Sequence, residues 1–293
     1  MLAECIEGLG IQPEGIYVDV TFGGGGHSKA LLKKLGEQGV LVAFDQDPDA
    51  EANRIANPAF ILVKDNFRFM QKQLQQRNLI PVNGILADLG VSSHQFDVAE
   101  RGFSIRFDHH LDMRMNTESG ITAREILNTY SEKDLVNIFS LYGEVKNSKQ
   151  LAATIVNSRR NQPIQSSTEL RSVMASLVPK ANENQYLAQV YQALRIEVND
   201  ELSALREMLE QASDILVSGG RLVVMSYHSL EDRLVKNFIA KGNFEGDDHK
   251  DFYGNIVGVK FRSITKKPVV PTATEVKNNP RSRSAKLRIA EKI

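Results

Sequence analysis

Three apolar runs, each reaching an aspartate at or near its end, constrain the fold of this chain most strongly. They are "YVDVTF" (17–22), "GVLVAFDQD" (39–47) and "NGILADLGVSS" (83–93). Helical patterns separate these runs, and strands that alternate with helices are typical of a parallel sheet covered by helices. Such sheets bind ligands at the carboxyl ends of their strands, where Asp19, Asp45 and Asp88 are expected.

The pattern changes after about residue 104. From there to about residue 200 the signals are helical, with helix starts at "SEKD" (131–134) and "SSTELRSVMASL" (166–177). A helical run over 184–217 exceeds the ~25 residues of ordinary helices, which predicts a break inside it. The strand-like "GRLVVMSYHS" (220–229) then resumes the sheet. We predict an α/β fold with a discontinuous domain, residues 1–104 and 201–293, and an inserted helical domain, residues 105–200.

Charge is distributed unevenly, although 36 basic side chains balance 36 acidic ones overall. Residues 259–293 contain ten basic and two acidic side chains, which predicts a polyanionic partner, RNA or DNA; a solvated basic tail is the alternative. Cys5 is the only cysteine, so neither a disulfide framework nor a cysteine-based metal cluster is expected. No apolar run approaches the ~18 residues of a membrane span. We expect a soluble, cytoplasmic protein that does not bind a membrane.

Four consecutive glycines, residues 23–26, follow the first predicted strand. A phosphate-binding loop ends in G-K-[ST], and a dinucleotide fingerprint needs a glycine where this chain has Ser28. S-adenosylmethionine fits better, because it needs close backbone approach and carries no phosphate. Asp45 is placed to accept its ribose hydroxyls, although the same spacing serves a dinucleotide ribose. His27, directly after the glycines, is expected to contact the cofactor, with a core histidine as the alternative.

These motifs and their order resemble the bacterial small-subunit (16S) ribosomal RNA cytosine-N4 methyltransferases of the MraW/RsmH type. The similarity extends over nearly the whole chain, including "YVDVTFGGGGHS", "LADLGVSSHQFD", "GGRLVVMSYHSLEDRLVKNF" and "NPRSRSAKLRIAE". It implies a Rossmann-like class I methyltransferase sheet with helices on both faces, plus an inserted all-helical domain. The implied cofactor contacts are Gly25, Gly26, His27, Asp45, Phe67, Asp88 and Gln95.

The resemblance also implies the partners. The cofactor is S-adenosylmethionine, converted to S-adenosylhomocysteine, without a metal, and the substrate is 16S rRNA within the small ribosomal subunit. A monomer or weak homodimer is expected. The chain departs from the family pattern at its start, where a His-containing segment would precede Glu4, at "FDHHLDMRM", and at Gln189, where a basic residue is usual. We expect a missing or replaced N-terminal contribution to the site and an altered grip on RNA.

The predicted catalytic residues follow two strands. The exocyclic N4 of cytosine is a weak nucleophile because its lone pair is delocalised into the ring. Asp88, whose carboxylate only accepts hydrogen bonds, is expected to orient N4 or, equally, to contact the methionine amino group. Tyr227 should lie nearby, and His228 is expected to take the released proton, with a structural role as the alternative.

Candidate RNA contacts lie in two segments. "ERGFSIRFDHHLDMRM" (100–115) interleaves Arg101, Arg106 and Arg114 with Phe103 and Phe107, as phosphate contacts and base stacking require. The alternative is a buried aromatic pair under a salt-bridged surface. Arg281 and Arg283 are the candidates in the basic segment. A nicotinamide-dependent dehydrogenase and a non-catalytic assembly factor are the competing functions.

Overall fold

The computed structural model describes residues 1–106, 108–178, 182–254 and 257–293. It divides into two compact units, residues 1–90 with 202–293, here the sheet unit, and residues 91–201, here the helical unit. The predicted boundary after residue 104 falls inside the helical unit, and the one after residue 200 lies beside the observed boundary. None of the described helices combines the length and apolar character needed to cross a membrane.

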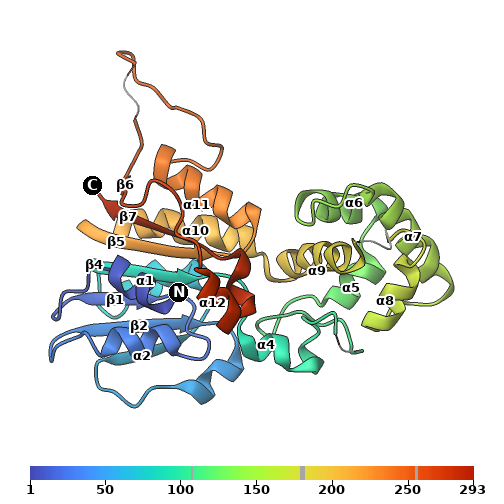
Figure 1. Cartoon of the computed structure of the whole chain (residues 1–293), viewed down its shortest axis with the longest axis horizontal. Coiled ribbons are helices and arrows are strands. Elements are labelled where there is room, and N and C mark those ends of the chain that lie inside the picture. Colours follow the sequence, from blue (N-terminus) through green and yellow to red (C-terminus); the bar gives the residue numbers. More distant parts are fainter. Residues whose placement is uncertain (107, 179–181, 255–256) are drawn as a thin grey trace. The chain divides into compact units, whose positions relative to one another are not determined.

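A seven-stranded sheet forms the sheet unit (Figure 1). Its strand order is β3-β2-β1-β4-β5-β7-β6; the first five pair in parallel, and β7 runs antiparallel to both its neighbours. The strands are β1 (Ile16–Asp19), β2 (Val40–Asp45), β3 (Phe60–Lys64), β4 (Val82–Asp88), β5 (Leu216–Ser226), β6 (Phe261–Ser263) and β7 (Lys286–Lys292).

Helices cover both faces of this sheet, because successive strand residues point to opposite sides. Val18 and Val42 share a buried cluster with residues of α3, α10 and α11, whereas Tyr17 and Leu41 share another with residues of α1 and α2. The helices are α1 (Leu2–Gly8), α2 (Gly26–Leu32), α3 (Met70–Gln75), α10 (Glu201–Ile215), α11 (Ser229–Lys241) and α12 (Ala273–Asn278). The predicted fold class, a Rossmann-like sheet with helices on both faces, is confirmed.

The helical unit has its own apolar core. Its helices are α4 (Ser93–Asp97), α5 (Ala123–Thr129), α6 (Glu132–Leu141), α7 (Ser148–Asn161), α8 (Ser167–Met174) and α9 (Glu183–Asn199). Ser131 and Ser166 cap α6 and α8 as the sequence predicts. The predicted break in the long helical run is Asp200, whose φ of 48° ends α9 before α10 begins.

The basic C-terminal segment takes a larger structural part than the sequence indicates. β6 and β7 complete the edge of the sheet. Lys286 and Arg288 lie 3.1 and 2.7 Å from the carboxylate of Asp232, and Lys260 lies 3.2 Å from Asp214. Several of the ten basic side chains are therefore held by acids of the same unit, and fewer are available for a polyanion than their number suggests.

Candidate active site

Three carboxylates gather at one edge of the sheet. Asp19, Asp45 and Asp88 are the last residues of β1, β2 and β4. Because these strands are parallel neighbours in the order β2-β1-β4, their carboxyl ends lie side by side. The predicted position of the three acids at the carboxyl ends of parallel strands is confirmed. That they bind a ligand there stays a prediction.

The buried carboxylate of Asp19 organises the segment with the four glycines, residues 23–26, here the glycine loop. Its Oδ2 accepts the hydroxyl of Ser28 at 2.7 Å, and its Oδ1 accepts the backbone N–H of Thr21 at 3.1 Å. The hydroxyl oxygen of Thr21 in turn accepts the backbone N–H of Asp88 at 2.7 Å. Burial raises the pKa of Asp19, and the Ser28 hydroxyl opposes that shift. Ser28 stands where a dinucleotide site would have glycine because its hydroxyl ties α2 to β1.

The glycines leave room for a ligand. Gly25 has a φ of +74° and caps α2 in the left-handed region, which glycine adopts without steric cost. A Cβ built on Gly25 would lie 3.0 Å from the Phe22 ring, whereas one on Gly24 or Gly26 would meet no atom within 4 Å. The loop thus combines a turn that needs glycine with open space in front of its backbone.

Asp45 is held by its own loop and the neighbouring one. Its Oδ2 accepts the backbone N–H of Gly23 at 2.7 Å and its Oδ1 accepts that of Asp47 at 2.9 Å. Burial raises the pKa of Asp45 to about 6, while these backbone donors oppose the shift. Each carboxylate oxygen has a second lone pair, so Asp45 keeps acceptor sites for the hydroxyls of a ribose.

Two other predicted cofactor contacts lie on short helical turns. Phe67 begins a 3₁₀ turn, Phe67–Phe69, just after β3, and it is partly buried against the sheet core. Gln95 belongs to the helical unit, where its side-chain oxygen accepts the backbone N–H of Ser92 at 2.9 Å in the capping box of α4. Gln95 thus has a local structural role, and its contact with a cofactor stays a prediction.

The carboxylate of Asp88 contacts two side chains from other parts of the sheet unit. The Tyr227 hydroxyl donates to its Oδ1 at 2.9 Å, and Nδ1 of His27 lies 3.6 Å from its Oδ2. Burial raises the pKa of Asp88 to about 6, and both His27 and the Tyr227 hydroxyl oppose the shift. The nearby Asp88 charge and burial together raise the pKa of Tyr227, so this tyrosine stays a protonated donor.

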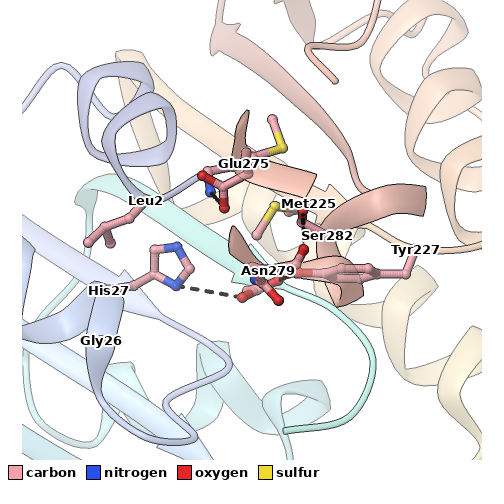
Figure 2. A pocket seen from close by; sticks show the side chains of 10 residues that line it. Leu2, Gly26, His27, Met225, Tyr227, Glu275, Asn279 and Ser282 are labelled. Atoms are coloured by element: carbon pink, nitrogen blue, oxygen red, sulfur yellow. Dashed lines mark hydrogen bonds and ion pairs between the residues drawn. The ribbon is translucent and has the colours of Figure 1, made fainter. Parts of the chain in front are cut away.

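A pocket of about 260 Å³ opens at this carboxylate. Figure 2 shows its lining side chains, with the dashed line from His27 marking the contact with Asp88. Its lining comes from the first turn of α2, the ends of β4 and β5, the C-terminal segment and the start of the chain: Gly26, His27, Asp88, Met225, Tyr227, Glu275, Asn279, Ser282, Met1 and Leu2. Nε2 of His27 is buried and has no hydrogen-bond partner among the described residues, as expected of an atom that meets a ligand.

His228 lies outside the lining of this pocket, at the start of α11. It caps α11: its Nδ1 accepts the backbone N–H of Glu231 at 3.4 Å, and its Nε2 lies 3.1 Å from Oε1 of Glu231. It is not among the residues that line the pocket. This geometry favours the structural alternative, and proton acceptance by His228 stays a prediction.

The candidate RNA contacts differ in exposure. Arg101 and Phe103 are buried, and Nη2 of Arg101 donates to the backbone oxygens of Arg114 and Met115 at 3.1 and 3.0 Å. Arg114 is paired with Asp112 at 2.8 Å. These positions favour a buried ring beneath ion-paired residues. Arg106 is exposed, and Phe107 lies outside the described residues.

In the basic segment, Arg281 and Arg283 are both exposed, on the 3₁₀ turn Pro280–Ser284. Ser282, between them, is buried. The two arginines therefore extend from a turn whose middle residue is anchored, which suits side chains that meet a partner.

A methylase family model matches the whole chain. The MraW methylase family matches residues 1–293. The chain belongs to this family. A protein of Bacteroides thetaiotaomicron named ribosomal RNA small subunit methyltransferase H is 54% identical over 292 residues, covering 100% of this chain and 96% of that relative. The protein of the same name from Flavobacterium johnsoniae is 55% identical over 293 residues, with the same coverage.

Among solved structures, an rRNA methylase from Streptococcus thermophilus covers 100% of this chain and 93% of its own. It is 14% identical, with a TM-score of 0.42.

The residues present fit the cofactor of a methylase that uses S-adenosylmethionine. The space before Gly24 and Gly26, the carboxylate of Asp45 and the unpartnered Nε2 of His27 supply room, an acceptor for ribose hydroxyls and a polar atom for the ligand. Sequence reasoning missed the roles of Asp19 and of the C-terminal wall. The role of Asp19 could have been found only from a pairing of Ser28 with the acid at the end of β1. The sequence contains no signal for the role of the C-terminal wall.

Proposed function

We propose that this methylase transfers a methyl group from S-adenosylmethionine to N4 of a cytidine in the decoding region of 16S rRNA. The observation that carries the proposal is Asp88, a carboxylate at the end of β4 that faces a pocket and is oriented by Tyr227 and His27. The names of the relatives from Bacteroides and Flavobacterium support the RNA substrate.

Asp88 would act on the amino group. An amine conjugated to a pyrimidine ring attacks poorly, because its lone pair is delocalised. A carboxylate that accepts an N4–H hydrogen bond localises this lone pair and holds N4 about 3 Å from the reacting carbon. The Tyr227 hydroxyl fixes the carboxylate by donating to Oδ1, which leaves Oδ2 and further lone pairs for the substrate.

Methyl transfer breaks one carbon–sulfur bond and forms one carbon–nitrogen bond. Bound S-adenosylmethionine would supply an electrophilic methyl group on a positively charged sulfur, which leaves as the neutral thioether of S-adenosylhomocysteine. N4 forms one new bond to carbon and must release one proton. With a pKa of about 6, Asp88 is ionised at neutral pH and is placed to accept this proton; the alternative acceptor is His228.

Binding of the rRNA would involve the helical unit and the exposed arginines of the basic segment. A base within a folded rRNA helix must be splayed out before its N4 is reachable. Arg281 and Arg283 are exposed cations close in sequence to the pocket wall. Replacing both with glutamine should weaken subunit binding and reduce the slope of log K against log salt by about one per lost phosphate contact. An unchanged slope would contradict this RNA contact.

The deciding experiment is tritiated methyl transfer to small subunits that lack the modification, followed by nucleoside analysis. We expect label in N4-methylcytidine; label in another nucleoside, or none, would overturn the proposal. A thermal melt with S-adenosylmethionine at 100 times its dissociation constant should show stabilisation of about 2.7 kcal/mol. A non-catalytic assembly factor would show none, and a dehydrogenase would instead change NADH fluorescence.

A further inference from the structure

The C-terminal segment contributes polar side chains to the lining of the pocket. This part of the lining is formed by α12, its C-cap and the 3₁₀ turn Pro280–Ser284, which bring Glu275, Asn279 and Ser282 to the pocket that also holds Asp88 and Tyr227 (Figure 2). These residues lie almost 200 positions after Asp88 in the chain. The fold thus places polar groups from a distant segment beside the expected position of N4.

The hydrogen bonds of the C-terminal residues in this pocket leave the side-chain amide of Asn279 available. The Tyr227 hydroxyl donates to Asp88 at 2.9 Å, and the Ser282 hydroxyl donates to the backbone oxygen of Asn279 at 2.7 Å. Oε1 of Glu275 accepts the N-terminal ammonium of Met1 at 2.7 Å. The side-chain amide of Asn279 makes no hydrogen bond within the described part of the chain and does not cap the turn that follows it. It therefore offers two N–H donors and one acceptor to a ligand.

The backbone of Asn279 is fixed although its side chain is exposed. Its N–H donates to the backbone oxygen of Glu275 at 2.7 Å, and its C=O accepts both the N–H and the hydroxyl of Ser282, at 2.9 and 2.7 Å. Ser282 is only 4% exposed. A side chain on a backbone held in this way presents its donors at a defined place, as recognition of a base edge requires.

We propose that Asn279 reads the ring edge of the target cytosine, its amide N–H donating to N3 or O2 while Asp88 accepts from N4. This inference rests on the proposed function. Cytosine offers a donor at N4 and acceptors at N3 and O2, so the pair of a carboxylate and an amide donor complements it. Uracil presents an acceptor at O4 and a donor at N3, which places its O4 against the carboxylate. Asn279 is thus a specificity residue, and Asp88 beside it excludes uracil.

The test uses full-length variants and small subunits that lack the modification. Asn279→Asp keeps the shape and replaces the donor with an acceptor, and Asn279→Ala removes the amide without adding charge. Asn278→Asp is the matched control, because it adds the same charge at the neighbouring exposed residue, which does not line the pocket. Methyl transfer gives kcat and KM, calorimetry gives the S-adenosylmethionine affinity, and a melt reports folding.

We expect kcat/KM to fall about 100-fold in Asn279→Asp and about tenfold in Asn279→Ala, mainly through kcat, because a buried base acceptor loses its donor. The Asn278→Asp control and all cofactor affinities should stay within about twofold of wild type. Wild-type rates in Asn279→Asp, a parallel loss of cofactor affinity, or an equal loss in Asn278→Asp would overturn the proposal. If the wild type itself yields no N4-methylcytidine, the proposed function fails as well, and that result is distinct from these.

Discussion

Asp45 and Asp88 end two strands of the same sheet and share a pKa raised to about 6 by burial. Their partners differ. Asp45 accepts two backbone N–H groups, from Gly23 and Asp47, whereas Asp88 is held by a tyrosine hydroxyl and faces a histidine. The similar shift therefore arises in two environments, one made of backbone and one made of side chains.

This difference in hydrogen-bond partners suits Asp45 to cofactor binding and Asp88 to the methyl-transfer step. Backbone donors cannot change their protonation state or move independently of the loop, so Asp45 is suited to hold a ligand in one place. The groups around Asp88 are the side chains of His27, in the first turn of α2, and of Tyr227, directly after β5, and both line the pocket. A carboxylate that must orient a nucleophile and accept a proton needs such a setting. We infer that Asp45 contributes to affinity and Asp88 to turnover.

Asp88→Asn should have the largest effect. The amide cannot accept a proton, and one of its two terminal atoms no longer accepts a hydrogen bond from N4. We expect kcat to fall about 10³-fold, while calorimetry shows a cofactor affinity close to that of wild type. If affinity falls in step with kcat, Asp88 serves mainly to hold the methionine amino group. If turnover persists with affinity intact, the orienting role is wrong.

Asp45→Asn tests the other side of the comparison. The amide NH₂ of the new asparagine would face one of the two backbone N–H donors, that of Gly23 or that of Asp47. The hydroxyls of the cofactor ribose would also lose an acceptor. We expect the dissociation constant for S-adenosylmethionine to rise about 10- to 100-fold, as for lost hydrogen bonds to a charged group. Turnover at saturating cofactor should remain near wild type. A loss confined to kcat would remove the distinction between the two acids.

Stability should also distinguish the two acids, and Asp88→Asn should raise stability although it lowers turnover. Because the folded-state pKa of Asp88 is about 6 against a model value of 3.8, the folded chain binds this proton more tightly. Its contribution to stability therefore falls as pH rises from about 4 to about 6. At pH 7.5, Asp88→Asn should be more stable than wild type, on the order of 1 kcal/mol by urea unfolding.

That gain should shrink as pH falls through about 6 and vanish below about 4, where the wild-type carboxyl becomes protonated in both states. Asp45→Asn should gain less or lose stability, because two backbone donors oppose the amide. Equal gains in both variants would show that their surroundings do not matter.

The sequence predicts these acids better than their partners. Apolar runs that end on aspartate place Asp45 and Asp88 at neighbouring strand ends, because local pattern and sheet topology suffice for that step. The approach of Tyr227 to Asp88 depends on β5 lying next to β4, and "SYHS" does not indicate which of its polar residues turns inward. The structure directs Tyr227 to Asp88 and His228 to Glu231. The contribution of Asn279 arises only from the packing of the C-terminal segment.

Tyr227→Phe should have the smallest effect. The Tyr227 hydroxyl is a donor that favours the ionised form of Asp88, so its removal raises the carboxyl pKa further above about 6. We expect kcat at pH 8 to fall only about 3- to 10-fold, the value of one lost hydrogen bond. The acid limb of the kcat profile should shift to higher pH, because the ionised form is the active one and is reached later. The control is Tyr253→Phe, at an exposed position of the sheet unit outside the pocket. An acid limb that stays in place in Tyr227→Phe would show that this limb reports a group other than Asp88.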